Sequence, residues 1–361
     1  MAEPHNNPKG NPMSRVFTAL ATTTAACLAL SATPAAAQSS VQIYGLLDVS
    51  VGQFQTAGAK KIKRMDSGNL STSYLGFRGT EDLGGGLRAG FTLDSFLLLD
   101  SGGASRVPGV DAFWGRNANV NISGGFGNVR LGRMGPPLFV STLRFNPFGD
   151  SFGYSPAIRQ YYNAPYGTAL VGDSGWNNAI GYTTPSLRGL TATVLIAAGE
   201  GAANARGPNI GAHVLYGSGP LAFTAAWQKV QAQGTLGRPI SAFPGFDSQT
   251  AWQLGGSYDL KVVRLFAQYG TVSTDANADV KVKTYQLGAA VPAGAGRVLA
   301  SYGNSELDFV PAGADRTSKM LTVAYDHLLS KRTNVYALYM SDKFTGLSSG
   351  TTLAVGVRHT F

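Results

Sequence analysis

The chain has 361 residues, of which 47 are glycine and only 14% are charged, with a formal net charge of +9 and a mean hydropathy of zero. This composition is too apolar for a disordered chain. A helical membrane protein requires several apolar runs of about 18 or more residues. This chain has only one long run of apolar or small residues, and it lies near the start. The length allows one large domain or two ordinary ones.

Residues 1–37 have the features of a secretory signal. Arg15 supplies positive charge, residues 16–30 are apolar or small, and the alanines that end at Ala37 form a small-residue cleavage pattern. We therefore expect cleavage after Ala37, which leaves residues 38–361 as the mature chain. A lipoprotein that begins at Cys27 is one alternative, but the residues before this cysteine lack the usual leucine. A buried helix over residues 16–30 is the other, and its place at the start of the chain disfavours it.

Most of the mature chain alternates apolar and polar residues with the period of two that is typical of β-strands. In the first such segment Val41, Ile43 and Val49 share one face, and Asp48 and Ser50 share the other. Counting these segments predicts sixteen strands, an even number as outer-membrane barrels require. The predicted strands are 41–51, 73–80, 87–96, 112–122, 128–133, 178–184, 190–198, 210–216, 221–231, 250–258, 262–271, 281–291, 297–304, 317–327, 333–342 and 353–361.

The connections between these segments fall into two classes that alternate along the chain. One class is short, such as the glycine-rich turn EDLGGG at residues 81–86, and the other is long and polar. Short turns at one rim and long loops at the other are typical of outer-membrane barrels. The barrel must be closed because unpaired backbone groups are costly in hydrocarbon. We therefore predict an all-β fold, a 16-stranded antiparallel transmembrane β-barrel with a water-filled lumen.

Residues 134–176, which follow the fifth predicted strand, are the one long stretch that does not alternate. They include eight Phe and Tyr residues and only four charged residues, Arg144, Asp150, Arg159 and Asp173. A long insert of this kind in a compact domain is usually functional. Because it is the third long connection, we expect a long third loop that folds into the lumen and narrows it.

Six motifs are spread over the whole mature chain. They are VQIYGLLDVSVG, SGNLSTSYLGFRGTEDLGGGLRAGF, FWGRNANVNISGGFGNVRLGR, WNNAIGY, LLSKRTNVYALY and the terminal VGVRHTF. Together they resemble the trimeric general-diffusion porins of Gram-negative β-proteobacteria, and GFRGTEDLGGGL is the most specific part. The resemblance implies a homotrimer in the outer membrane, an inward-folded third loop, and recognition of Phe361 by the barrel-assembly machinery. It also implies a tendency toward anion selectivity that arises from basic residues on the wall.

The chain departs from this family pattern in its expected bore. Tyr74 stands where relatives usually have Arg, and Trp176 stands where an Arg is common shortly before the next strand. The insert is unusually aromatic and carries balanced charge. Because the two replacements remove positive charge, we expect only weak anion selectivity.

Four arginines are the candidates for the wall of the constriction: Arg78, Arg116, Arg130 and Arg133. Arg78 and Arg130 face inward by the strand period, and Arg133 ends a strand where the insert begins. Arg116 shares its period with apolar residues, so either a bulge turns it inward or it lies at an interface; the resemblance favours the lumen. Arg78 has a second interpretation, as the partner of a nearby carboxylate.

On the insert, the candidates are Arg144, Asp150, Arg159 and Asp173. A ring of charges attracts ions of one sign and repels the other, and the two aspartates could oppose the wall arginines across the bore. Turn formation, which aspartate favours, explains both aspartates equally well.

These patterns predict a porin in the outer membrane of a Gram-negative bacterium, a passive channel for small hydrophilic solutes and ions. The alternative is a substrate-specific porin whose aromatic insert binds a sugar or an aromatic acid. The histidines of the mature chain lie in no catalytic or metal-binding spacing, so we expect no enzyme, metal or cofactor. Scattered basic residues argue against nucleic-acid binding. The expected partners are two further copies of the chain, outer-membrane lipid and lipopolysaccharide, and the assembly machinery.

Overall fold

The computed structural model describes residues 40–361 apart from 107–110, 164–169, 200–206, 232–242 and 311–314. The predicted secretory signal at residues 1–37 lies outside the described residues and stays a prediction. In the part of the chain that is described, no helix is long and apolar enough to cross a membrane.

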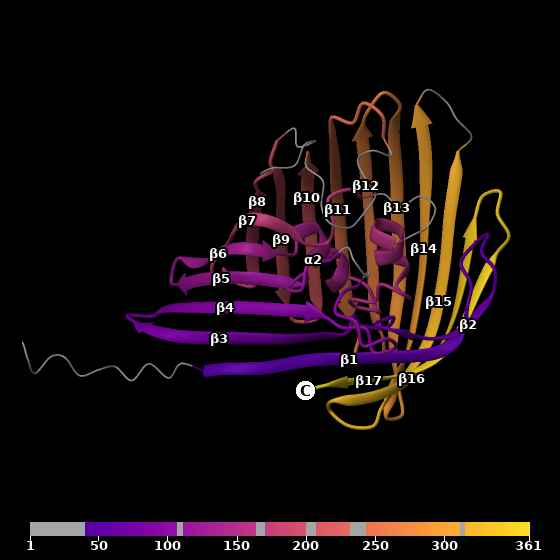
Figure 1. Ribbon diagram of the computed structural model, residues 1–361, viewed down its shortest axis with the longest axis horizontal. Coiled ribbons are helices and arrows are strands. Elements are labelled where there is room, and N and C mark those ends of the chain that lie inside the picture. The colour runs from indigo at the N-terminus through magenta and orange to yellow at the C-terminus, as the bar shows by residue number, and fades with distance from the viewer. Residues whose placement is uncertain (1–39, 107–110, 164–169, 200–206, 232–242, 311–314) are drawn as a thin grey trace, which may run out of the picture.

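The described residues form one antiparallel sheet of seventeen strand segments (Figure 1). The segments are β1 (Ser40–Phe54), β2 (Ile62–Ser67), β3 (Tyr74–Gly84), β4 (Leu87–Phe96), β5 (Asn117–Gly124), β6 (Gly127–Met134), β7 (Trp176–Thr183), β8 (Leu190–Ala197), β9 (Asn209–Ser218), β10 (Leu221–Val230), β11 (Ser248–Asp259), β12 (Arg264–Asp275), β13 (Asp279–Ala293), β14 (Gly296–Val310), β15 (Arg316–Leu328), β16 (Thr333–Phe344) and β17 (Gly350–Thr360). Each of the sixteen predicted strands overlaps one of these segments.

The sheet closes into a ring of sixteen positions because β2 and β3 share one of them. The first half of β1 pairs with β3, and its second half pairs with β2. On its other edge β1 pairs with β17, from Leu46 opposite Thr360 to Gln53 opposite Leu353. The terminal Phe361 extends this closing seam through backbone hydrogen bonds of 3.1 and 3.2 Å to Gly45. The predicted 16-stranded antiparallel barrel is confirmed.

Several predicted strand ends differ from the structure by a few residues, such as the end of β14 at Val310 and not at residue 304, and two differences concern basic residues. The fourth strand begins at Asn117 and not at residue 112, so Arg116 precedes β5. The basic segment around Lys63 and Arg64, expected to be loop, forms β2 instead. The two errors have different causes. The apolar residues Phe113 and Trp114 look like part of a strand although pairing begins only at Asn117, and the basic residues of β2 hide the strand period.

The turn EDLGGG forms as the sequence predicts. Gly84, Gly85 and Gly86 have φ angles of 82°, 60° and 80°. These angles lie in the left-handed region that glycine adopts at little cost. The chain can therefore reverse between β3 and β4 with almost no loop.

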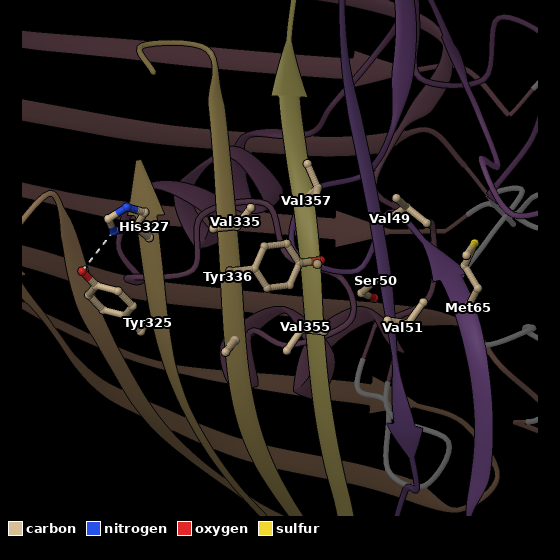
Figure 2. Close-up of a pocket in the computed structure, with 12 residues that line it drawn as sticks. Val49, Ser50, Val51, Met65, Tyr325, His327, Val335, Tyr336, Val355 and Val357 are labelled. Atoms are coloured by element: carbon tan, nitrogen blue, oxygen red, sulfur yellow. Dashed lines mark hydrogen bonds between the residues drawn. The ribbon is translucent and has the colours of Figure 1, made fainter. Parts of the chain in front are cut away.

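The two faces of the barrel differ in polarity as the period predicts. Val41 and Ile43 of β1 are 65% and 64% exposed, whereas Asp48 and Ser50 on the opposite face are buried. Figure 2 shows the apolar outer face at the closing seam, where Val49 of β1 lies near Val357 of β17. A groove of about 570 Å³ on this face has an almost wholly apolar lining. An apolar exterior and a polar interior are what a barrel in lipid requires.

Candidate functional site

The insert between β6 and β7 contains three short helical segments. They are α2 (Pro137–Arg144), α3 (Pro156–Ile158) and the π-helix η1 (Arg159–Asn163). Both α-helices begin with proline, which is preorganised for the first helical position. Helix α2 contacts β8 to β11, and α3 contacts β13 to β15. The stretch that breaks the strand pattern is thus folded, and it packs against the barrel wall on two sides.

Helix α2 is hydrogen-bonded to the polar face of the wall. Ser141 Oγ lies 3.0 Å from His213 Nδ1 on β9 and 2.9 Å from Thr224 Oγ1 on β10. Gln253 of β11 donates to Thr142 Oγ1 at 3.1 Å, and Gln268 of β12 donates to the Thr142 carbonyl at 3.1 Å. These wall residues alternate with outward apolar ones, so α2 lies against the inner face.

The second half of the insert is bound to the far side of the ring. Tyr154 Oη lies 3.0 Å from Ser50 Oγ on β1, and the Thr322 hydroxyl of β15 donates to the Tyr154 carbonyl at 2.7 Å. Ser151 Oγ donates to the Asn69 carbonyl, between β2 and β3, at 2.6 Å. Because β10 stands eight positions from β1 in the closed ring of strands, the insert is bonded to opposite sides of the barrel.

The end of the insert is held by a buried ionic cluster. Arg133 Nη2 lies 3.1 Å from Asp173 Oδ2, and its other nitrogens donate to the carbonyls of Gly115 and Gly175 and to Asn177. Arg106, in the connection between β4 and β5, pairs with Asp173 at 3.5 Å and with Asp111 at 2.9 Å. This Arg133–Asp173–Arg106–Asp111 cluster joins β6, the insert and the β4–β5 connection.

The geometry of Asp173 and Arg159 is that of structural anchors. Asp173 is 2% exposed and has a φ angle of 71°. Arg159 is 5% exposed, pairs with Asp342 of β16 at 3.5 Å and donates to the Gly153 carbonyl at 3.2 Å. The insert's other two candidates differ from these: Arg144 is exposed and Asp150 is half-buried.

An aromatic cluster occupies the middle of the insert. The ring centroid of Phe139 lies 5.9 Å from that of Phe152 and 5.1 Å from that of Tyr162, and the last two rings are 6.4 Å apart. All three side chains are half-buried. The cluster therefore combines a rigid, mutually packed body with a partly open aromatic surface.

On the wall, Arg78 and Arg116 lie at the two ends of a ladder of arginine and tyrosine side chains. Arg78 Cζ stands 4.6 Å from the ring centroid of Tyr44, and Arg116 Cζ stands 3.9 Å from that of Tyr74. The two rings are 5.9 Å apart. Stacking over an aromatic face stabilises a guanidinium group without neutralising its charge. Tyr74 therefore stands at the position where relatives usually have an arginine, and its ring positions the guanidinium group of Arg116.

The ladder also answers the two questions left open for these arginines. Arg78 donates to Gln42 Oε1 at 2.9 Å, so within the described residues it has no carboxylate partner. Arg116 pairs with Asp94 Oδ2 of β4 at 2.9 Å, which places its guanidinium group on the inner side. The strand period predicted an outward side chain for Arg116. This prediction was wrong because Arg116 precedes β5, where the period does not apply.

Arg130 of β6 is half-buried and, like Arg78, forms no ion pair with any residue that the structure describes. Of the eight candidates, the structure pairs Arg133 directly with Asp173 and joins Arg78 to Arg116 through the ladder of Tyr44 and Tyr74. Sequence reasoning missed Arg106, because it lies in a long connection without a pattern. It also did not select Arg264 of β12, whose strand period places it on the inner face. Within the described chain, no three His, Cys, Asp or Glu residues group as a metal site requires.

A closed sixteen-stranded barrel with an apolar exterior and an insert bonded across its polar interior defines the class of the protein as an outer-membrane channel. The sequence profile of the Gram-negative porin family matches residues 22–347. The chain belongs to this family, and the predicted resemblance to the β-proteobacterial porins is confirmed. It is an outer-membrane porin of a Gram-negative bacterium, and its family and fold point to a channel.

Relatives and solved structures cover nearly the whole chain. Outer membrane porin protein 32 of Delftia acidovorans is 34% identical over 358 residues, which are 91% of this chain and 95% of that protein. The anion-selective porin from Comamonas acidovorans has a TM-score of 0.74 at 29% identity and covers 90% of this chain and 100% of its own. OmpT of Vibrio cholerae, described in a trimer form, has a TM-score of 0.66 at 14% identity and covers 90% and 99%.

Proposed function

We propose that the insert at residues 134–176 is the constriction of a passive channel that admits small hydrophilic solutes and ions. The observation that carries this proposal is the bonding of the insert to opposite sides of the ring, through Ser141 on one side and Tyr154 on the other. A segment held at both ends across a lumen reduces its cross-section and excludes large solutes.

The proposal is tested by the conductance of the purified protein in planar lipid bilayers. A passive pore gives stepwise current increments that grow in proportion to salt concentration. Swelling of protein-loaded liposomes in sugars of increasing size then gives the exclusion limit. The absence of current steps, or swelling rates that do not depend on sugar size, would contradict a constricted passive pore.

We also propose that the channel is weakly anion-selective and that its inner arginines set the sign. Arg78 and Arg130 form no ion pair with any described residue, so their positive charges are not neutralised. Arg116, by contrast, is paired with Asp94. Arg144 and Asp150 on the insert carry single charges of opposite sign, which cancel in its net charge. Arg133, Arg159 and Asp173 are neutralised in buried pairs and add little to the field. The anion-selective porin from Comamonas acidovorans supports this assignment.

A substrate-specific porin is the second candidate function, and the aromatic cluster of Phe139, Phe152 and Tyr162 favours it. Aromatic faces stack on sugar rings and on aromatic acids. A block by one solute that is relieved when Phe139 or Phe152 is replaced with Ala would support this candidate over general diffusion.

The chain is further proposed to act as a homotrimer. The support is the family resemblance and a second apolar groove, of about 690 Å³, on the outer face of β1 and β3 to β6. Mass measurement of the detergent-solubilised protein tests this state, and a monomer would contradict it. Binding of lipopolysaccharide and recognition of Phe361 by the assembly machinery stay predictions.

A further inference from the structure

A cavity of about 420 Å³ lies beside the C-terminal end of α2. Arg144 and Phe145 of the insert line one side. The wall side is formed by Thr191 of β8, Leu215 of β9 and Arg264 of β12. These wall residues have the same strand period as the inner residues Thr193, His213 and Gln268. The cavity is therefore part of the lumen, near the rim where the short turns lie.

Two guanidinium groups face this cavity without an acidic partner among the described residues. Arg144 is exposed and forms no ion pair there. Arg264 donates to Ser257 Oγ at 3.1 Å, and its Cζ stands 5.2 Å from the ring centroid of Phe266. By contrast, Arg116, Arg133 and Arg159 each pair with an aspartate. Two cations on one cavity repel each other unless an anion lies between them.

A simpler role exists for Arg144 alone. It occupies the last turn of α2, where a cation stabilises the helix by about 0.3–1 kcal/mol through the macrodipole. That role does not explain why Arg264, which lies on β12 far along the chain from α2, faces the same cavity. Two guanidinium groups that line one cavity from different elements form a site suited to an anion.

The rest of the lining selects among anions. Phe145 and Leu215 are apolar, and Thr191 supplies a hydroxyl group. A chloride ion would use only the two arginines. A carboxylate with a ring or short chain would use the arginines through paired hydrogen bonds, and it would bury its apolar part against the remaining wall. We propose that this cavity is a binding subsite for small organic carboxylates with an apolar body. The proposal rests on the proposed passive channel and deepens it.

The test uses the whole protein in planar bilayers in KCl, with sodium benzoate as the probe and benzamide as its neutral analogue. Benzoate is expected to lower the conductance in a saturating way, and benzamide is expected to leave it unchanged. Arg264→Gln and Arg144→Gln should each raise the half-blocking benzoate concentration about tenfold or more, as loss of one charge-assisted hydrogen bond predicts. Arg88→Gln is the matched control, because Arg88 also lies near the short-turn rim, on β4, outside the cavity lining.

Three results would overturn the proposal. The first is a wild-type channel that conducts KCl but is not blocked by benzoate, which leaves the passive channel intact. The second is equal block by benzamide. The third is unchanged block in both arginine variants, and because Arg144 is exposed and unpaired, its variant tests the site without disturbing the wall. A protein that conducts no KCl would contradict the passive channel itself.

Discussion

The Tyr336 hydroxyl of β16 donates a hydrogen bond of 2.8 Å to Asp48 Oδ1 of β1, and so reaches across the intervening strand β17. The ring passes over Gly356, where an added Cβ would lie 2.3 Å from Tyr336 Cζ. Asp48 is fully buried and also accepts the backbone N–H groups of Leu70 and Ser71 at 2.7 and 3.0 Å. One carboxylate therefore fixes both the closing seam and the break between β2 and β3.

Replacing Tyr336 with Phe is expected to destabilise the closed barrel. The substitution removes one partner of a buried carboxylate, which costs about 1–3 kcal/mol. The denaturant midpoint in detergent measures the effect. Tyr339→Phe is the matched control, because Tyr339 lies on the same strand, is 41% exposed and faces outward. Equal midpoints for the two variants would show that the Tyr336–Asp48 bond does not stabilise the seam.

Replacing Arg133 with Gln is expected to destabilise the barrel and release the end of the insert. Removing one partner of a buried ion pair costs up to about 3–5 kcal/mol, and here the cost is at the lower end because Asp173 keeps its pair with Arg106 at 3.5 Å. Arg64→Gln is the control, because the Arg64–Asp66 pair is exposed. Exposed pairs contribute about 0–1 kcal/mol. Noisier channel current in the Arg133 variant is the second expected readout. A stable, quiet Arg133→Gln channel would contradict the anchoring role.

The Arg133–Asp173–Arg106–Asp111 cluster should make stability depend on pH. Burial alone would raise the pKa of Asp111, but its hydrogen bonds and ion pair with Arg106 outweigh burial and hold this pKa below its ordinary value. The unfolded chain, in which the Asp pKa is about 3.9, then binds the proton more readily than the folded chain. Stabilisation by Asp111 is therefore complete above about pH 4–5 and is lost as the pH falls through the lower folded pKa.

The measurement compares wild type with Asp111→Asn across pH. The stability difference should be largest near neutral pH and should shrink as the pH falls below about 4. A difference that is constant down to pH 2 would show that the charge of Asp111 is not what stabilises the cluster.

Deleting residues 139–152 should raise conductance more than it changes ion selectivity. The segment contains most of α2 and two of the three rings of the aromatic cluster, but only Arg144 and Asp150 as charges, which balance. The paired variant Phe139→Ala with Phe152→Ala should give a smaller rise, and Phe126→Ala, on an exposed short turn, should give none. Single-channel conductance and the zero-current potential are the measurements. A larger change in selectivity than in conductance would reverse this interpretation of the insert.

The period-two pattern was sufficient to predict the barrel, because a sheet between lipid and water must alternate along almost every strand. The same pattern placed Arg78 and Arg130 on the inner face. It failed at Arg116, where the strand had not yet begun, and at β2, where basic residues disguised a paired segment.

The pairing within the site could not be predicted from local sequence. Arg133 looked like a wall charge because its partner Asp173 lies forty residues away along the chain. Arg159 meets Asp342 of β16 only because the insert crosses to that side of the ring. Long-range ion pairs of this kind depend on the closed topology, and no spacing in the sequence encodes them.

The central claim is that unpaired inner arginines give a constricted passive pore a weak preference for anions. The zero-current potential across a bilayer in a tenfold KCl gradient tests it most directly. We predict a potential whose sign corresponds to faster chloride than potassium permeation. We predict a shift toward zero in an Arg78→Gln, Arg130→Gln double variant that still conducts. A cation-selective sign in the wild type, or an unchanged potential in the double variant, would contradict the account.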